Sequence, residues 1–215
     1  MIFRNPQLAI YIVPALLIAI TFHEYAHGWV AHRLGDPTPG SRGRLSLNPI
    51  VHIDPFGLLM LAVVGFGWAK PVPVNPMYFR GNRRRGMLLV ALAGSVTNFL
   101  LAFATGLFFW LNRIYLFGSV LGGHLEILLY FLVIYNLYLG LFNLLPVPPL
   151  DGSKILGSIL PHRYTPYLVQ FERYGYIILI ILLFTRTLPR ILVPMADILL
   201  DLINSFWVTI LSLFL

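Results

Sequence analysis

The chain alternates long uncharged stretches with short clusters of charge. Two stretches are uncharged from end to end: residues 87–112 are 26 residues long and residues 127–150 are 24 residues long. A helix rises 1.5 Å per residue, so about 20 residues cross the ~30 Å hydrocarbon core of a bilayer. Each stretch therefore predicts a membrane-spanning helix. Residues 8–31 predict another, interrupted only by His23, Glu24 and His27.

The remaining apolar stretches are less regular. Residues 167–184 and 191–215 each contain two charged residues, and we interpret them as two further helices. Residues 55–69 are uncharged for only 15 residues, too few to cross, and the sequence KPVPVNP follows at 70–76. Prolines and alternating valines favour extended backbone, which at membrane depth must be sheltered by protein. We therefore predict a re-entrant or β-hairpin-like segment after the first span.

Composition agrees with this pattern. The 215 residues are 58% apolar and 11% charged, and the mean hydropathy is +0.81. These values lie well outside the range of soluble domains. We predict an all-α polytopic membrane protein with about five to six transmembrane helices. No internal repeat or soluble accessory region breaks the pattern, so residues 1–215 are expected to form a single membrane-embedded domain.

The net charge of +7 raises the question of nucleic-acid binding. The basic residues fall between apolar stretches and not along one soluble face, so we expect no nucleic-acid partner and a role in topology instead. If the N-terminus is outside, eleven Lys and Arg residues lie in inner loops and four in outer loops. The positive-inside rule then places residues 33–86 and 146–166 in the cytoplasm. We expect a multi-pass protein of a prokaryotic plasma membrane.

The first span carries the sequence H-E-x-x-H at residues 23–27. Helix positions four apart lie about 40° apart around the axis and ~6 Å along it, so His23 and His27 can converge on one ion. Two imidazoles with a neighbouring glutamate suit zinc, with Glu24 taking a proton from metal-bound water. Each ionisable group at mid-bilayer costs ~2.5 kcal/mol or more, which favours this reading over a polar patch that ties helices together.

Catalytic zinc needs a third protein ligand and one open position. The chain has no cysteine, so this ligand must be His, Asp or Glu. Asp151 is the preferred candidate, because it follows the span at 127–150 at a depth similar to that of the histidines. Prolines and a glycine surround it and allow the backbone to bend inward. The other candidates are Asp36, Asp54, Glu126, Glu172, Asp197, Asp201, His32, His52, His124 and His162.

Three segments carry a resemblance to a known family. HEYAH at 23–27, FGWAKPVPVNP at 66–76 and NLLPVPPLDG at 143–152 occur in an order and spacing that closely resemble the site-2 protease family of intramembrane zinc metalloproteases. The resemblance covers residues 8–155, which it identifies as the catalytic core, with accessory helices at about 165–215. The sequence AGSVTNF at 93–99 resembles the family's AGPxxNF element but has Ser95 where proline is usual.

The resemblance implies a site and a reaction. His23, His27 and Asp151 would hold one zinc ion per chain, Glu24 would activate water, and Asn143 would stabilise the transition state. Single-span membrane proteins would be the substrates, cleaved within the bilayer near its cytoplasmic side. Family members often carry a PDZ or CBS domain, and this chain has neither.

A transmembrane helix must be unwound before its peptide bonds can be hydrolysed. The extended segment around Val72 and Val74 offers an edge to which such a substrate could add as a strand. For Asn98 we favour a contact with substrate; a catalytic role and a hydrogen bond across helices are the alternatives. His52 is expected to hydrogen-bond a loop carbonyl, and Asp197 and Asp201 to face a polar seam or the outer interface.

Another class of function fits part of this pattern. A divalent-metal transporter, or another metal-binding membrane protein, would also place His23, His27 and Asp151 around an ion. Transport would not need Glu24 beside the pair of histidines, and would more often show acidic residues on several helices. A different metalloprotease class would use a glutamate as the third ligand. The sequence does not indicate the oligomeric state.

Overall fold

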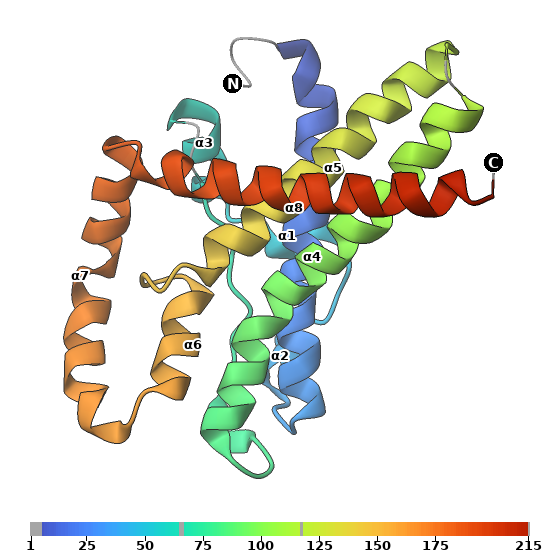
Figure 1. Ribbon diagram of the computed structural model, residues 1–215. Coiled ribbons are helices and arrows are strands. Elements are labelled where there is room, and N and C mark those ends of the chain that lie inside the picture. Colours follow the sequence, from blue (N-terminus) through green and yellow to red (C-terminus); the bar gives the residue numbers. More distant parts are fainter. Residues whose placement is uncertain (1–5, 65–66, 117, 215) are drawn as a thin grey trace.

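We describe a computed structural model of residues 6–64, 67–116 and 118–214. Figure 1 shows an all-helical chain of long helices joined by loops and shorter helices, and the described residues contain no strand. The helices are α1 (Ala9–Arg33), α2 (Thr38–Ser41), α3 (Pro55–Val64), α4 (Arg83–Tyr115), α5 (Val120–Leu144), α6 (Asp151–Ile159), α7 (Thr165–Phe184) and α8 (Thr187–Ser212).

Five helices of the described chain are long and apolar enough to cross a membrane: α1, α4, α5, α7 and α8. Large apolar side chains remain exposed on their outer faces; Leu100 on α4 is 63% exposed and Ile177 on α7 is 55% exposed. Such surfaces suit lipid and not water. The protein is therefore an integral, multi-pass membrane protein, as predicted.

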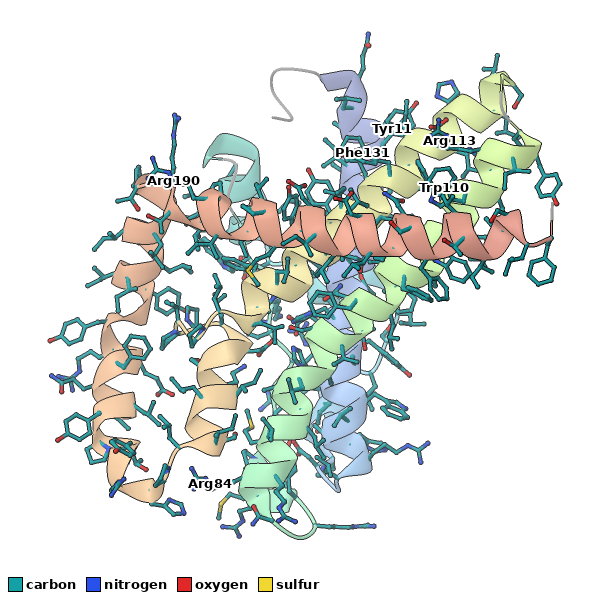
Figure 2. All side chains as sticks on the ribbon, in the orientation of Figure 1. Tyr11, Arg84, Trp110, Arg113, Phe131 and Arg190 are labelled. Carbon is teal, nitrogen blue, oxygen red and sulfur yellow. The ribbon has the colours of Figure 1, made fainter. Side chains whose placement is uncertain are left out.

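Arginine residues mark the two ends of the molecule. Figure 2 shows Arg84 at the opposite end from Arg113 and Arg190. Arg84 belongs to the first turn of α4 and Arg113 to its last, so the charges flank the apolar length of the helix. This is the distribution on which the predicted topology was based.

Helices α1, α4 and α5 pack against one another through small residues. The buried stripe of α4 recurs every fourth residue and contains Gly86, Val90, Gly94, Asn98, Ala102 and Gly106. The facing stripe of α1 includes Ala15, Ala19, His23 and Ala31. Small side chains let helix backbones approach closely in a membrane, where apolar packing alone provides little drive for association. The close approach brings polar side chains of different helices within bonding distance.

The α4 helix also settles the effect of Ser95. This residue stands where the resembling family has proline, which raised the question whether the helix bends there. In the structure α4 runs without interruption from Arg83 to Tyr115, because serine retains the backbone N–H that proline lacks. Ser95 itself is buried.

The segment between α1 and α4 differs in part from the prediction. Residues 55–64 form α3 and are not extended, because Pro55 occupies the first helical turn and Asp54 accepts a hydrogen bond from Gly57 N–H at 2.8 Å. Its hairpin-like feature is a single antiparallel bridge between Ile53 and Ala69. Residues 65 and 66 of the predicted segment lie outside the described residues.

The proline-rich stretch that follows is fixed to the end of α1. Asp36 is fully buried and accepts hydrogen bonds from Thr38 N–H at 2.9 Å and Asn75 N–H at 2.7 Å. A carboxylate that binds two backbone N–H groups ties the two segments together. Residues 70–75 consequently lie against α1, on the side that carries Glu24.

The C-terminal helices complete the structure. α6 begins immediately after the proline-rich turn that ends α5, and α7 and α8 follow it. In Figure 1, α8 runs across α4 and α5 and not alongside them. A buried apolar cluster joins α7 and α8 to α4 and α5 and contains Ala102, Val133, Leu137, Leu141, Leu150, Leu179, Leu188, Leu192, Ala196 and Ile203.

Candidate metal centre

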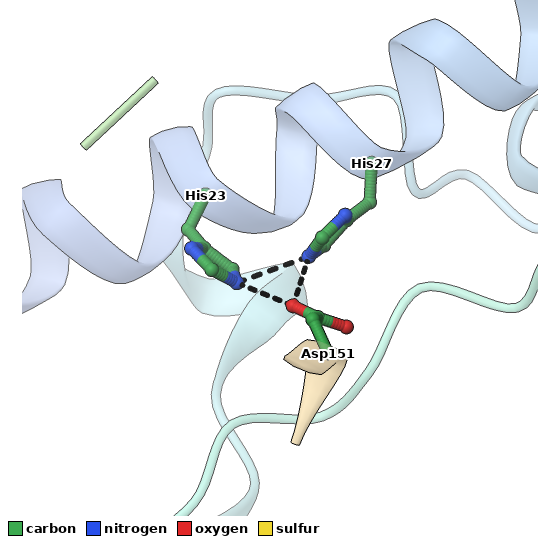
Figure 3. A group of neighbouring side chains, drawn as sticks. All are labelled: His23, His27 and Asp151. Carbon is green, nitrogen blue, oxygen red and sulfur yellow. Dashed lines mark hydrogen bonds and ion pairs between the residues drawn. The ribbon is translucent and has the colours of Figure 1, made fainter. Parts of the chain in front are cut away.

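Three buried ligand atoms from α1 and α6 converge on one point. The Nε2 atoms of His23 and His27 are 3.0 Å apart, and Oδ2 of Asp151 lies 3.1 Å from the first and 2.9 Å from the second. Figure 3 shows the triangle, with the two rings approaching from adjacent turns of α1 and the carboxylate from the start of α6. All three residues are buried and at most 7% exposed. This is the sole such group among the described residues.

Hydrogen bonds on the far side of each ring fix which nitrogen carries the proton. Nδ1 of His27 lies 2.7 Å from the carbonyl oxygen of Val90, and Nδ1 of His23 lies 2.6 Å from Oδ1 of Asn98. Both oxygens can only accept, so both Nδ1 atoms must donate. In the neutral rings, each Nε2 is then left with a bare lone pair directed at Asp151.

This donor set fits a divalent metal. When both rings are neutral, the three atoms carry lone pairs that face one another at about 3 Å, and a divalent cation among them would turn this repulsion into attraction. Tetrahedral zinc, with bonds of 2.0–2.1 Å, spaces its ligand atoms about 3.3 Å apart, which is within a few tenths of an ångström of the observed triangle. The carbonyl and amide that hold the Nδ1–H groups are the outer partners that zinc-binding histidines ordinarily have.

The backbone around Asp151 is shaped to deliver one oxygen. Gly152 has no room for a side chain, since a Cβ there would lie 2.2 Å from the carbonyl oxygen of Leu145. This close approach turns α6 back toward α1. Nζ of Lys154 binds the other carboxylate oxygen, Oδ1, at 2.9 Å. Lys154 therefore leaves Oδ2 as the atom that faces the two imidazoles.

Glu24 lies beside this group and is held by the proline-rich segment. Its Oε2 accepts a hydrogen bond from Val72 N–H at 2.9 Å. Val72 is buried, and its side chain packs where Gly28 leaves space on α1. The contact fixes one carboxylate oxygen of Glu24 and leaves Oε1 as the atom that can take a proton.

The other predicted site residues do not all face the triangle. Asn143 is half-buried and donates from Nδ2 to the carbonyl of Leu139 in its own helix at 3.0 Å; its second N–H is not used by that bond. Val74 packs against the cluster of Ala31, Phe79 and Val90. The side chains at 72 and 74 thus point into the protein, and any contact with substrate must use the backbone of this segment.

Asn98 makes the hydrogen bonds across helices that were one of the alternatives for it. Its side chain is fully buried and bonds His23, the carbonyl of Ala19 and Asn136. All of its hydrogen-bonding groups therefore face protein, and the favoured contact with substrate stays a prediction.

The remaining candidate ligands lie outside the triangle. His52 is fully buried, and its Nε2 binds the carbonyl of Ser46 at 2.8 Å, which confirms the predicted loop contact. Asp197 and Asp201 are exposed on α8. Neither these residues nor the other candidate ligands join the triangle in the described part of the chain.

Sequence reasoning missed Gly94, Lys154 and Asn136. Gly94 sits directly under the ring of His23: a Cβ there would lie 2.5–2.7 Å from its Cε1, Nε2 and Nδ1. The sequence signal for Gly94 was the four-residue spacing that it shares with Asn98 and Ala102. Asn136 was detectable as an unexplained amide within an uncharged span.

The packing of Gly94 gives a test of the centre. Gly94→Ala must displace the His23 ring, so the affinity for zinc should fall about tenfold or more, the loss typical when the support of a ligand is removed. Zinc bound per chain, measured in detergent against a competing chelator, checks this. Gly123→Ala is the control, because nothing lies within 4 Å of its Cβ position. Equal affinity of the two variants would contradict the geometry.

Comparison with known proteins agrees with the site. A profile of peptidase family M50 matches residues 113–185. YwhC of Bacillus subtilis is 42% identical over 191 residues, which cover 87% of this chain and 86% of YwhC. Rip2 of Mycolicibacterium smegmatis is 32% identical over 191 residues, covering 84% and 69%. MJ0611 of Methanocaldococcus jannaschii is 33% identical over 165 residues, covering 72% and 75%.

Each of these three relatives bears the name "Putative zinc metalloprotease". No solved structure matches the chain with significance. The matches to these relatives cover between 72% and 87% of this chain, and the segment matched by the family profile contains Asp151. On this evidence the chain belongs to peptidase family M50, as a multi-pass membrane member whose cofactor is zinc.

Proposed function

We propose that this protein hydrolyses peptide bonds within the transmembrane segments of single-span membrane proteins. The observation that carries the proposal is the depth of the buried triangle of His23, His27 and Asp151. At 1.5 Å per residue, His23 and His27 lie about 15 and 9 Å along α1 from its last residue, Arg33. A bilayer core is ~30 Å thick, and these depths along the helix support a site inside it.

The charge distribution supports a cytoplasmic position for the active site. Arg33 ends α1, Arg83–Arg85 begin α4, and Lys154 follows Asp151. These residues surround the same end of the three helices, and the positive-inside rule assigns that end to the cytoplasm. We place the protein in a prokaryotic plasma membrane with this orientation.

Zinc, when bound, would lower the pKa of a coordinated water toward ~7 and polarise the scissile carbonyl. The residues of the chain do the remainder. His23 and His27 present bare Nε2 atoms, and Asp151 presents a single oxygen because Lys154 occupies the other. Their rings and carboxylate are held by buried hydrogen bonds, so little reorganisation is needed when the reaction begins.

Glu24 is the proton carrier. Its Oε2 is fixed by Val72 N–H, so Oε1 is the atom that takes the proton from the attacking water and returns it to the leaving amine. Asn143 supplies an amide N–H at the inner end of α5, eight residues before Asp151. We assign it the stabilisation of the developing oxyanion.

The substrate would bind along residues 70–75. Backbone N–H groups of Lys70, Val72 and Asn75 already bind His52, Glu24 and Asp36, respectively. Pro71 and Pro73 contribute carbonyl oxygens but no N–H. An unwound substrate strand would therefore donate hydrogen bonds to this edge at those two residues, and would receive none from them.

Water would reach the site from the Lys154 side. A cavity of about 390 Å³ lies between α4, α6 and α7. Most of its lining is apolar, but the charged groups of Arg84, Lys154 and Glu172 also face it and could hold water there. Lys154 connects this cavity to Asp151, and hydrolysis requires water at a depth where lipid excludes it.

Glu24→Gln tests the reaction class. Proteolysis of a single-span substrate should fall at least ~100-fold, because the amide cannot take the proton, while zinc remains at one per chain. Cleavage in detergent and metal analysis are measured together. Glu126→Gln is the control, because Glu126 is a half-buried residue near the start of α5 that pairs with Arg113. Wild-type cleavage by Glu24→Gln would refute the role of Glu24. Metal flux into liposomes without any proteolysis would favour the transporter instead.

Val72→Pro tests how Glu24 is held. Proline removes the N–H that fixes Oε2 but keeps an extended backbone between two other prolines. We expect kcat to fall about tenfold or more, since hydrogen bonds to charged groups contribute ~1.5–3 kcal/mol, with zinc content unchanged. Val72→Ala keeps the N–H and is the matched control. If both variants have the same kcat, the contact does not matter for catalysis.

A further inference from the structure

A chain of hydrogen bonds crosses the three central helices and ends on His23. On α5, Nδ2 of Asn136 donates to the carbonyl of Leu132 at 2.8 Å. Oδ1 of Asn136 accepts from Nδ2 of Asn98 on α4 at 2.7 Å. Asn98 also donates to the carbonyl of Ala19 on α1 at 3.0 Å, and its Oδ1 binds Nδ1 of His23 at 2.6 Å.

Main-chain carbonyls at both ends fix the direction in which this series of hydrogen bonds runs. The carbonyl of Leu132 can only accept, so Nδ2 of Asn136 must face it and Oδ1 must face Asn98. The carbonyl of Ala19 likewise requires Nδ2 of Asn98. Rotating the Asn98 amide by half a turn would place its oxygen against two other oxygens, those of Ala19 and Asn136. The amide is therefore locked with Oδ1 toward His23.

This orientation decides the protonation of the metal ligand. An oxygen at Nδ1 of His23 requires a proton on Nδ1, which leaves Nε2 free to bind a metal. A rotated Asn98 would present N–H to Nδ1 and select the other tautomer, with the proton on Nε2. That proton would occupy the direction in which Asp151 and His27 lie.

We infer that Asn136 is a positioning residue of the metal centre, acting through Asn98 to hold His23 in its metal-binding tautomer. The inference rests on the proposed zinc centre. Asn136 and Asn98 are both 0% exposed. Burying two amides within a membrane helix bundle is costly unless every polar atom is paired, and here all four side-chain oxygen and nitrogen atoms are bonded.

A purely structural role makes a different prediction. If the amides only tie α5 to α4, their loss would lower stability without changing the metal site. Asn112 provides the comparison, because it is a second buried asparagine of α4 that donates to a main-chain carbonyl, that of Gly122 on α5, at 3.0 Å. It bonds the same two helices but has no link to His23 in the described structure.

The test is a titration of the metal-free protein in detergent with Co²⁺, whose visible spectrum reports ligand geometry. Asn136→Leu should weaken Co²⁺ affinity about tenfold or more and alter the spectrum. Asn112→Leu should change neither the affinity nor the spectrum, although the two variants should have similar melting temperatures. Asn136→Asp should recover much of the affinity, because a neutral carboxyl keeps both an acceptor for Asn98 and a donor for Leu132. Asn136→Ala replaces the leucine variant if that variant does not fold.

The outcomes separate the inference from the proposed function. Wild-type affinity and spectrum in Asn136→Leu or Asn136→Ala would overturn the inference, while loss of binding in His23→Ala would still support the zinc centre. Equal losses in the Asn136 and Asn112 variants would also overturn it, since the effect would then be general destabilisation. Absence of Co²⁺ binding by the wild type at His23 would overturn both.

Discussion

The structure depends on holding three metal-ligand atoms, each with a lone pair, close together in a buried site. His23 and His27 lie on the buried face of α1, and Asp151 starts α6. In lipid, such groups are costly unless each is paired. Every outward polar atom of the three is bonded, to Val90, Asn98 or Lys154, so what remains unpaired is the inner triangle that a divalent cation neutralises.

Helix packing supplies the closeness that this triangle needs. The ring of His23 rests on Gly94, and Gly152 lets the chain turn against the end of α5. Hydrogen bonds connect the site to its surroundings: Asp36 holds residues 70–75 against α1, and this places Val72 N–H on Glu24. Metal ligands, proton carrier and the edge proposed for substrate are thus fixed by one set of backbone contacts.

Much of this was accessible from the sequence. The lengths of the uncharged stretches predicted the membrane-spanning helices. The two histidines of the H-E-x-x-H motif are four residues apart, which predicted two ligands on one face of a helix. Helix α3 was missed because a short apolar run has no periodicity that separates helix from extended backbone. The role of Asn98 stayed open because the sequence shows an amide in a span but not which other helices its side chain meets. Contacts between distant helices, such as that of Gly94 with His23, have no local signal.

The most direct test of the account is X-ray absorption at the zinc edge of the purified protein. The account predicts one zinc per chain with nitrogen and oxygen ligands at about 2.0–2.1 Å and the outer-shell scattering of two imidazoles. Bound zinc without imidazole scattering, or with scattering from a single imidazole, would contradict a centre built from His23, His27 and Asp151.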